Sequence, residues 1–341
     1  MTISIVPDYQ IFDLINGHVE NIGPRMQKKL HALRNTLPED LTGKSVLDIG
    51  CDFGFWSFLA AQRGASSVIG LDRGRKVKGS YVDLPSYNNE RAVGTVCSFE
   101  KTNLGREWKY YGKQDVCLLM SLYHHIYHQT ESHLPIWYWL YRHTKETLIW
   151  ENPTEANDSV VKINVAGHLH PKYTKSHILE AASEYFNYKY VGPAEHEPTR
   201  SVYIFTPRKL PTPIYSGVVK SGAGGATQAF NYADKRRSKE FEEILGFMPY
   251  PGSLNVELET PFDWNKHYFR AKVLDVANRA DGMDSHWVPR WARFYPVIVE
   301  GKKAFAFRFE GDQYRENFIE LIAESRLRDV AEGFVRIQCL V

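Results

Sequence analysis

Apolar runs of strand length recur along the first 207 residues, separated by polar turns and by segments with helical periodicity. The run at 45–49 breaks into glycines and is followed by a helical pattern at 58–63 and a second apolar run at 67–72. A strand, a helix and a strand in this order predict a βαβ unit. Three later runs predict further strands of the same sheet, at 113–121, 147–151 and 201–206.

The two ends of the chain show other patterns. Near the amino terminus, apolar residues recur at helical spacing, at Ile11, Leu14 and Ile15 and again at Met26, Leu30 and Leu33. This spacing predicts that the first forty residues are helical and cap a site at the sheet or cover the sheet itself. Beyond residue 213, a strand-like segment at 214–219 leads into a glycine-rich stretch, and a helix is expected to end near Leu245.

The length of the chain and a proline-rich segment within it indicate two domains. The chain has 341 residues, more than a usual single domain. Prolines at 207, 211 and 213 mark a linker between the two patterns. We therefore expect a helical cap over 1–40, an α/β domain over 41–209 and a second domain over 214–341.

Charge and cysteine usage narrow the class of protein. The formal net charge is +2, so a large nonspecific nucleic-acid footprint is not expected and nucleic acid is an unlikely partner. The sequence shows no signal peptide and no transmembrane run, which predicts a cytoplasmic protein. Four cysteines stand without metal-binding spacing and are expected as reduced core thiols. The oligomeric state is left open.

The glycine turn after the first predicted strand carries the first chemical signal. It reads Leu47-Asp48-Ile49-Gly50-Cys51-x-x-Gly54, and Asp72 ends the next strand about twenty residues later. A tight turn lets the backbone approach a ligand, and a carboxylate at the tip of the second strand can bind both ribose hydroxyls. The Gly-x-Gly-x-x-Gly pattern of dinucleotide enzymes is absent.

Over roughly residues 40–207 the chain resembles class I S-adenosylmethionine-dependent methyltransferases, which implies a Rossmann-like α/β fold. The resemblance places Asp48 under the methionine amine region, the turn from Gly50 to Gly54 along the cofactor and Asp72 on its ribose. Asp52 stands where the family usually has glycine and would face the cationic end of the cofactor. Ser121, at the end of the fourth predicted strand, completes the cofactor-binding set.

The segment after this strand faces the position where acceptor atoms meet the cofactor methyl group in the family. It lacks both the Asp/Asn-Pro-Pro-aromatic stretch and the Pro-Cys pair of DNA-base methyltransferases. His124 or His125 is the candidate base for a hydroxyl, because the pKa of histidine lies near neutrality; a hydrogen-bonded pocket wall is the alternative. His124, His128 and His133 are also a weaker metal candidate.

Three motifs follow in order in the last third of the chain. The first is the glycine-rich stretch, the second reads Leu245-Gly-Phe-x-Pro-Tyr-Pro-Gly-Ser-Leu-Asn255, and the third is Glu320 to Arg328. Each taken alone is compatible with ordinary turns. As an ordered set, from Tyr215 to Val341, they resemble the archaeal CTP-dependent riboflavin kinases, which implies a mainly β, cradle-loop barrel.

That resemblance implies a role for each motif. Ser253 and Asn255 would hold Mg²⁺, and Glu320 would orient or deprotonate the hydroxyl that receives phosphate. Serine replaces the usual threonine of the metal pair, and the segment 310–315 departs from the family's flavin-contacting segment. The residues expected at the CTP phosphates are Gly222, Ala223, Gly224, Gly225, Ala226 and Thr227. The residues expected to close on the nucleotide are Ser325, Arg326, Leu327 and Arg328.

Together the two resemblances predict a bifunctional enzyme that uses S-adenosylmethionine, CTP and Mg²⁺. It would methylate an oxygen or nitrogen and phosphorylate a hydroxyl of a small polar metabolite such as a sugar, nucleoside or flavin-like compound. In the alternative, the barrel only binds a nucleotide or a nucleotide-linked acceptor and presents it for methylation. A tRNA-modifying role would require a basic groove that the sequence does not show.

Overall fold

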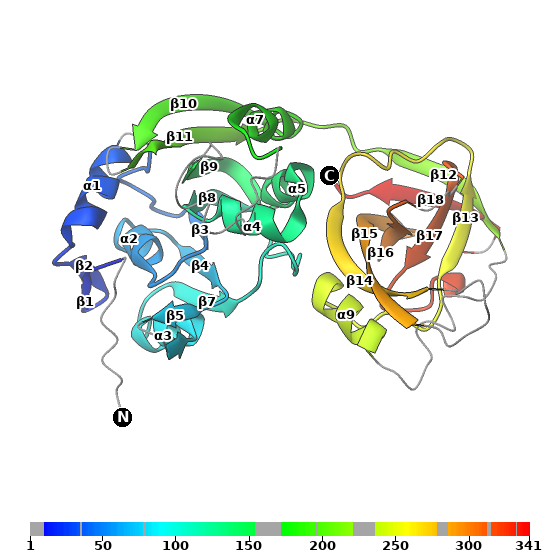
Figure 1. Ribbon diagram of the computed structural model, residues 1–341, viewed down its shortest axis with the longest axis horizontal. Helices are drawn as coiled ribbons and strands as arrows, with labels where there is room; N and C mark the ends of the chain where they lie inside the picture. The colour runs from blue at the N-terminus through cyan, green and yellow to red at the C-terminus, as the bar shows by residue number, and fades with distance from the viewer. Residues whose placement is uncertain are drawn as a thin grey trace. The chain divides into compact units, whose positions relative to one another are not determined.

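The computed structural model divides the chain into two compact units (Figure 1). The first unit comprises Met1–Leu104, Tyr110–His133 and Leu140–Arg208, and the second comprises Gly105–Lys109, Leu134–Trp139 and Lys209–Val341. The main change from one unit to the other therefore falls inside the proline-rich segment 207–213. The structure describes residues 10–34, 36–77, 80–153, 172–194, 197–220, 236–277, 286–311, 315–331 and 333–341.

A seven-stranded sheet forms the centre of the first unit, in the order β10-β11-β9-β8-β3-β4-β7. Five neighbouring strands from β9 to β7 run parallel, whereas β11 is antiparallel to both β9 and β10. All strands that the sequence predicted for this sheet are present. Their bounds are β3 (Ser45–Ile49), β4 (Ser67–Asp72), β7 (Cys97–Lys101), β8 (Gln114–Met120), β9 (Thr144–Pro153), β10 (Phe186–Ala194) and β11 (Glu197–Pro207).

Burial explains why the central strands could be read from the sequence. All seven residues of β8 are buried, as are four of the five residues of β3. Strands covered by helices on both faces read as continuous apolar runs. The remaining elements of this part are α2 (Phe55–Gln62), β5 (Arg75–Val77), β6 (Ser80–Val82), α3 (Leu84–Arg91), α4 (Tyr123–Thr130), α5 (His133–His143) and α7 (Lys175–Ser183).

The expectation of a helical segment over the first forty residues is wrong for residues 11–20. These form a hairpin of β1 (Asp13–Ile15) and β2 (His18–Glu20). Asn16 and Gly17 turn the hairpin with φ of 51° and 80°, the left-handed conformation that an Asn-Gly turn favours. Helix α1 (Pro24–Ala32) follows, begins at a proline that pre-sets the helical φ, and confirms the helical spacing of its part of the chain.

The second unit contains a closed antiparallel barrel, as predicted. Its sheet has the order β14-β15-β16-β17-β13-β12-β18, and pairing of β15 with β18 closes six of these strands into a ring. Closure leaves the ring without open edges, and its interior is filled by apolar side chains such as Val256, Val297 and Leu321.

The bounds of the barrel strands are β12 (Ile214–Lys220), β13 (Leu254–Leu258), β14 (Phe269–Ala277), β15 (His286–Val299), β16 (Lys302–Phe309), β17 (Phe318–Ile322) and β18 (Phe334–Cys339). Helix α9 (Arg236–Leu245) ends where the sequence predicted, and a short 3-10 helix η1 spans Leu327–Asp329. The four cysteines are free thiols. In the described parts of the chain, no helix is long and apolar enough to cross a membrane.

Candidate functional site

A cavity of about 620 Å³ opens at the carboxyl ends of the parallel strands in the first unit. Ligands of open α/β sheets bind at this end, where neighbouring connections diverge. The cavity unites the sequence-predicted residues Gly50, Asp52, Asp72, Ser121 and the histidine pair. Asp48 and Gly54 are not among the described residues that line it.

The turn after β3 is shaped for close approach. Gly50, Asp52 and Gly54 all have positive φ, at 77°, 49° and 81°. A Cβ added to Gly50 would lie 2.6 Å from Leu122 Cδ2, so any side chain here would displace that leucine. The backbone N–H of Gly50 donates to Leu71 O at 2.8 Å and ties the turn to the end of β4. This geometry brings the turn and Asp72 to the same wall.

Asp72 is held in place by two backbone amides. Its Oδ2 accepts from Asp52 N at 3.0 Å and its Oδ1 from Gly74 N at 2.8 Å. Burial raises the pKa of Asp72, and the two hydrogen bonds oppose that shift. The carboxylate is therefore fixed at the tip of β4, half-buried in the cavity wall.

Asp52, which stands where the resembled family usually has glycine, forms an ion pair with a cationic side chain of the same unit. Asp52 Oδ1 lies 2.8 Å from Arg75 Nε, and both side chains line the cavity. Aspartate tolerates the left-handed conformation better than most residues, which accounts for its occurrence at this φ. The expectation that Asp52 faces the cationic end of the cofactor stays a prediction, with Arg75 as a competing partner.

Asp48 lies below the turn as a buried acid. Its side chain accepts from Ser57 Oγ at 2.7 Å through Oδ2, while Oδ1 has no hydrogen-bond partner among the described residues. Because burial disfavours the charged form, the pKa of Asp48 rises to about 7. Its predicted place under the methionine amine region is not tested by these contacts.

The two candidate bases stand together in the cavity wall on α4. The ring centroids of His124 and His125 are 4.1 Å apart. His124 is fully buried, and neither ring nitrogen has a hydrogen-bond partner among the described residues. Burial lowers the pKa of His124 well below its usual value; it lowers that of His125 to about 4, helped by the nearby Arg73. Both imidazoles are therefore neutral at neutral pH.

The metal reading of the histidines is not supported by their contacts. His133 Nδ1 shares a hydrogen bond with Tyr123 OH at 2.7 Å, and its Nε2 lies 2.8 Å from Lys172 O. Both ring nitrogens are thus engaged in structural bonds. Among the described residues, no group of three or more His, Cys, Asp or Glu side chains is arranged to hold a metal ion.

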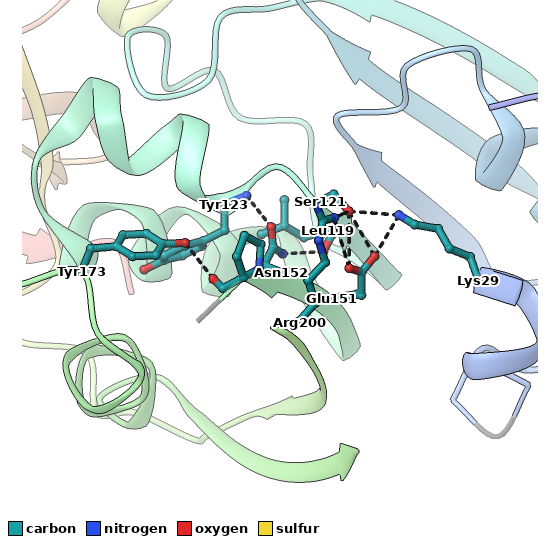
Figure 2. A network of polar contacts seen from close by, with 9 residues as sticks. Lys29, Leu119, Ser121, Tyr123, Glu151, Asn152, Tyr173 and Arg200 are labelled. Atoms are coloured by element: carbon teal, nitrogen blue, oxygen red, sulfur yellow. Dashed lines mark hydrogen bonds and ion pairs between the residues drawn. The ribbon is translucent and has the colours of Figure 1, made fainter. Parts of the chain in front are cut away.

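A buried charged cluster borders the cavity and was missed by the sequence reasoning. It consists of Lys29 from α1, Glu151 from β9, Arg200 from β11 and Ser121 (Figure 2). Lys29 Nζ lies 2.9 Å from Glu151 Oε2, and Arg200 Nη1 lies 3.4 Å from Glu151 Oε1. These four residues come from distant segments with no common motif, so only the tertiary fold brings them together.

Ser121 is the hub of this cluster, which we call the Ser121 cluster. Lys29 Nζ donates to Ser121 Oγ at 3.0 Å, Arg200 also donates to it, and that hydroxyl donates to Glu151. Ser121 N–H donates to Glu151 O at 2.6 Å, which fixes the residue at a positive φ of 63°. The predicted cofactor residue thus also contacts the buried ions.

The barrel has a smaller cavity of about 190 Å³ near the second and third motifs. Ser253 and the whole segment Ser325 to Arg328 line it, so residues of the second and third motifs meet at this cavity. Arg328 Nη2 donates to Lys220 O at 3.4 Å and links the segment to the end of β12. The glycine-rich residues Gly222 to Thr227, which follow β12 directly, lie outside the described residues.

Strand pairing places the predicted metal pair beside the predicted acid. Asn255 on β13 stands opposite Glu320 on β17, and Ser253 Oγ donates to Glu320 Oε1 at 2.5 Å. All three side chains are partly exposed at the same end of the two strands. A hydroxyl, an amide oxygen and a carboxylate form an oxygen-rich donor set of the kind that suits Mg²⁺.

Comparison with known proteins gives a family match for the carboxy-terminal part of the chain. Residues 219–333 match the family CTP-dep_RFKase, described as "Domain of unknown function DUF120". A riboflavin kinase from Methanocella arvoryzae is 35% identical over 120 residues, which cover 34% of this chain and 50% of that protein. One from Methanosarcina barkeri is 34% identical over 115 residues, covering 33% and 48%. The chain thus spans about half the length of the curated relatives it matches.

The first unit is comparable to solved methyltransferases at low sequence identity. An S-adenosylmethionine dependent methyltransferase from Mesorhizobium loti is 16% identical with a TM-score of 0.41, covering 53% of this chain and 98% of that chain. The strand order of the sheet, with its antiparallel pair at one edge, agrees with the predicted Rossmann-like architecture. The carboxy-terminal part of the chain therefore matches the CTP-dep_RFKase family and is similar to riboflavin kinases over that region, and the amino-terminal part has a Rossmann-like sheet.

Proposed function

We propose that the chain is a bifunctional enzyme in which the first unit methylates and the second phosphorylates a small polar metabolite. The observation that carries the methyltransferase half is the shared cavity wall. It joins the close-approach turn at Gly50, the fixed carboxylate of Asp72 and two neutral histidines. The kinase half rests on the family match and on the convergence of Ser253, Asn255 and Glu320.

In the first unit, Asp72 would accept hydrogen bonds from the ribose hydroxyls, and the turn at Gly50 would lie along the cofactor. When bound, S-adenosylmethionine supplies a methyl group on a sulfonium, which becomes a neutral thioether as the methyl moves to an oxygen or nitrogen of the acceptor. His125 is unprotonated at neutral pH and would accept the proton that the acceptor loses. His124, which has even less contact with solvent, would shape the wall beside it.

In the second unit, Ser253 and Asn255 would contribute oxygen ligands to Mg²⁺, whose charge would offset that of the CTP phosphates. Glu320 would orient the acceptor hydroxyl and take its proton as the oxygen bonds to the γ-phosphorus and the bond to the departing CDP breaks. The segment Ser325 to Arg328 would cover the nucleotide, and the glycine-rich stretch would surround its phosphates. Phosphoryl transfer needs positioning and charge neutralisation above all, which this arrangement supplies.

One observation favours a second function for the barrel, the binding of a nucleotide without phosphoryl transfer. Ser253 Oγ is already hydrogen-bonded to Glu320, so the pair could serve a barrel that binds a nucleotide without transferring phosphate. In that case the barrel would present a nucleotide or a nucleotide-linked acceptor for methylation.

Binding measurements test each half separately. The purified chain is titrated with S-adenosylhomocysteine, and then with CTP and ATP in the presence and absence of Mg²⁺. We expect S-adenosylhomocysteine to bind with or without metal, and CTP to bind more tightly than ATP and only with Mg²⁺. A chain indifferent to CTP under both conditions would leave methylation as its chemistry, and one indifferent to S-adenosylhomocysteine would remove the methyltransferase assignment.

A further inference from the structure

We propose that Asn152 is a positioning residue for methyl transfer, because its side-chain amide holds the start of helix α4 and with it His124 and His125. The proposal rests on the methyltransferase function of the first unit and adds a residue that acts through the histidines. Asn152 lies on β9, is fully buried and is not among the described residues that line the cavity. Its effect on the reaction would therefore pass through the residues that it holds.

The amide of Asn152 bridges the end of β8 and the beginning of α4 (Figure 2). Its Oδ1 accepts from the backbone N–H of Tyr123 at 2.7 Å, and its Nδ2 donates to Leu119 O at 3.0 Å. Tyr123 is the first residue of α4, and Leu119 is the last but one residue of β8. One side chain from the neighbouring strand β9 thus holds both sides of the connection from β8 to α4.

The bond to Tyr123 takes the place of a local helix cap. The first amides of a helix have no partner within the helix, and the side chain just before the helix commonly accepts from one of them. That position is occupied here by Leu122, whose side chain cannot accept a hydrogen bond, and its residue makes no side-chain cap. Asn152 therefore supplies from β9 the cap that the sequence around the start of α4 does not supply itself.

The connection has a backbone conformation that needs support. Ser121 has a φ of 63°, in the left-handed region that non-glycine residues rarely adopt. Its N–H donates to Glu151 O at 2.6 Å, so the consecutive β9 residues Glu151 and Asn152 hold the connection at three points. A backbone in this region persists only where the surrounding structure fixes it. Loss of the two Asn152 bonds would let the connection relax and α4 shift.

The positions of the two histidines depend on the backbone of α4. They are its second and third residues, and both line the cavity. No hydrogen bond to a described residue fixes the ring nitrogens of His124, and the ring of His125 packs against it with 4.1 Å between centroids. A general base must lie within hydrogen-bond reach of the proton that it takes, and a displacement of about 1 Å can cost roughly 10²-fold in rate. The cap at Tyr123, one residue before His124, therefore bears directly on the reaction.

The test compares Asn152→Leu and Asn152→Asp with the wild type in the full chain. Leucine has about the size of asparagine but makes neither hydrogen bond, whereas aspartate can still accept from Tyr123 N–H. With saturating methyl-labelled S-adenosylmethionine and a metabolite extract as the source of acceptor, we expect Asn152→Leu to transfer methyl groups roughly ten- to hundred-fold more slowly. Asn152→Asp should retain most of the rate. Calorimetry should show an unchanged affinity for S-adenosylhomocysteine in both variants.

A second readout does not depend on activity. In the full chain saturated with S-adenosylhomocysteine, NMR measures the pKa of the His125 ring, whose signal is assigned with His125→Gln. Burial lowers this pKa to about 4, helped by Arg73, His128 and Arg200. If Asn152→Leu displaces α4, the ring leaves this environment and its pKa should rise toward about 6.5. Asn152→Asp is left out of this comparison, because a new carboxylate would itself raise the pKa of a nearby histidine.

Asn89 provides a matched control in the same unit. Its Nδ2 donates to Phe99 O at 2.7 Å and its Oδ1 accepts from Phe99 N at 2.9 Å, so this amide links α3 to the backbone of β7. Asn89→Leu removes the same two kinds of hydrogen bond without touching α4. It should leave the transfer rate and the pKa of His125 unchanged, and circular dichroism verifies that each variant is folded.

Three results would overturn the proposal. They are a folded Asn152→Leu with the rate and the His125 pKa of the wild type, an equal loss of rate in Asn89→Leu, and a loss of S-adenosylhomocysteine affinity as large as the loss of rate. If Asn152→Leu does not fold, Asn152→Asp decides the matter. Retained transfer supports the proposal, and lost transfer in a folded variant whose Tyr123 amide stays protected from hydrogen exchange contradicts it.

The methyltransferase function itself is tested separately. A wild-type chain that does not bind S-adenosylhomocysteine would contradict that function, on which the proposal rests, rather than the role of Asn152 in holding α4.

Discussion

At the scale of single residues, Asp72 carries the most direct prediction of the cofactor site. Two backbone amides fix its carboxylate, so Asp72→Ala removes a ligand-binding group without breaking a side-chain network. We expect a ten- to hundred-fold loss of affinity for S-adenosylmethionine, equivalent to about 1.5 to 3 kcal/mol for charge-assisted hydrogen bonds. Calorimetry measures it. Asp72→Asn keeps the shape of the side chain but loses its charge, so its affinity for S-adenosylmethionine should lie between those of the wild type and Asp72→Ala. Equal affinities in all three proteins would refute this placement of the ribose.

The histidine pair predicts a characteristic pH dependence. Because burial and the nearby Arg73 lower the pKa of His125 to about 4, the imidazole stays unprotonated over most of the acid range. If His125 is the base, kcat/KM for methylation should fall with decreasing pH only as the pH approaches 4. His125→Gln should lower kcat by about 10² to 10⁴ and retain S-adenosylmethionine affinity.

His124→Gln is the matched comparison, because the two rings are neighbours and differ mainly in burial. A large loss of kcat in His124→Gln alone would make His124 the base and His125 the residue that shapes the wall. Full activity in both variants would show that neither histidine is a base. Methyl transfer to a cytosine carbon of duplex DNA would contradict the proposed oxygen or nitrogen acceptor.

Asp48 links the cofactor turn to the stability of the fold. The unfolded chain releases its proton near pH 4, whereas the folded chain retains it until about pH 7. The contribution of this group to stability is therefore full at low pH and is lost as the pH rises through 7, by roughly 4 kcal/mol. Asp48→Asn does not titrate, so its thermal stability should gain on wild type between pH 4 and 7 and then run parallel. Curves that stay parallel throughout would disprove the raised pKa.

At the scale of elements, the antiparallel pairing of β13 and β17 predicts different effects for its two polar residues. Asn255→Ala removes a proposed metal ligand and should abolish Mg²⁺-dependent CTP binding and phosphoryl transfer. Glu320→Gln keeps a hydrogen-bonding partner for Ser253 but cannot take a proton, so CTP should still bind while transfer is lost. Nucleotide titration and a transfer assay separate the two; the same phenotype in both variants would argue against distinct roles.

Elements also show what could be predicted from sequence. The central strands β3 and β8 could be predicted because they are buried on both faces and carry apolar runs, and β4 has an apolar run although it is only partly buried. The hairpin before α1 was missed because Ile11, Leu14 and Ile15 satisfy a helical spacing, although Asn16-Gly17 is a hairpin turn signal. The Ser121 cluster had no sequence signal, since α1, β9 and β11 are brought together only by the tertiary fold.

At the scale of the whole molecule, the central claim is that one chain carries two activities on one class of small metabolite. Each unit has its own core and its own cavity, so a substitution in one site should leave ligand binding at the other site unchanged. The Asp72 and Asn255 variants therefore serve as reciprocal controls: each should bind one ligand more weakly or not at all and keep its affinity for the other.

The most direct measurement incubates the protein with a metabolite extract, methyl-labelled S-adenosylmethionine, γ-labelled CTP and Mg²⁺, and follows products by mass spectrometry. We expect a compound that gains one methyl group and one phosphate. Asp72→Ala should suppress the methyl label, and Asn255→Ala the phosphate label. If phosphorylation comes first, Asn255→Ala should suppress the methyl label as well. Two labels that only ever appear on unrelated compounds, or a phosphate label that never appears, would contradict the account.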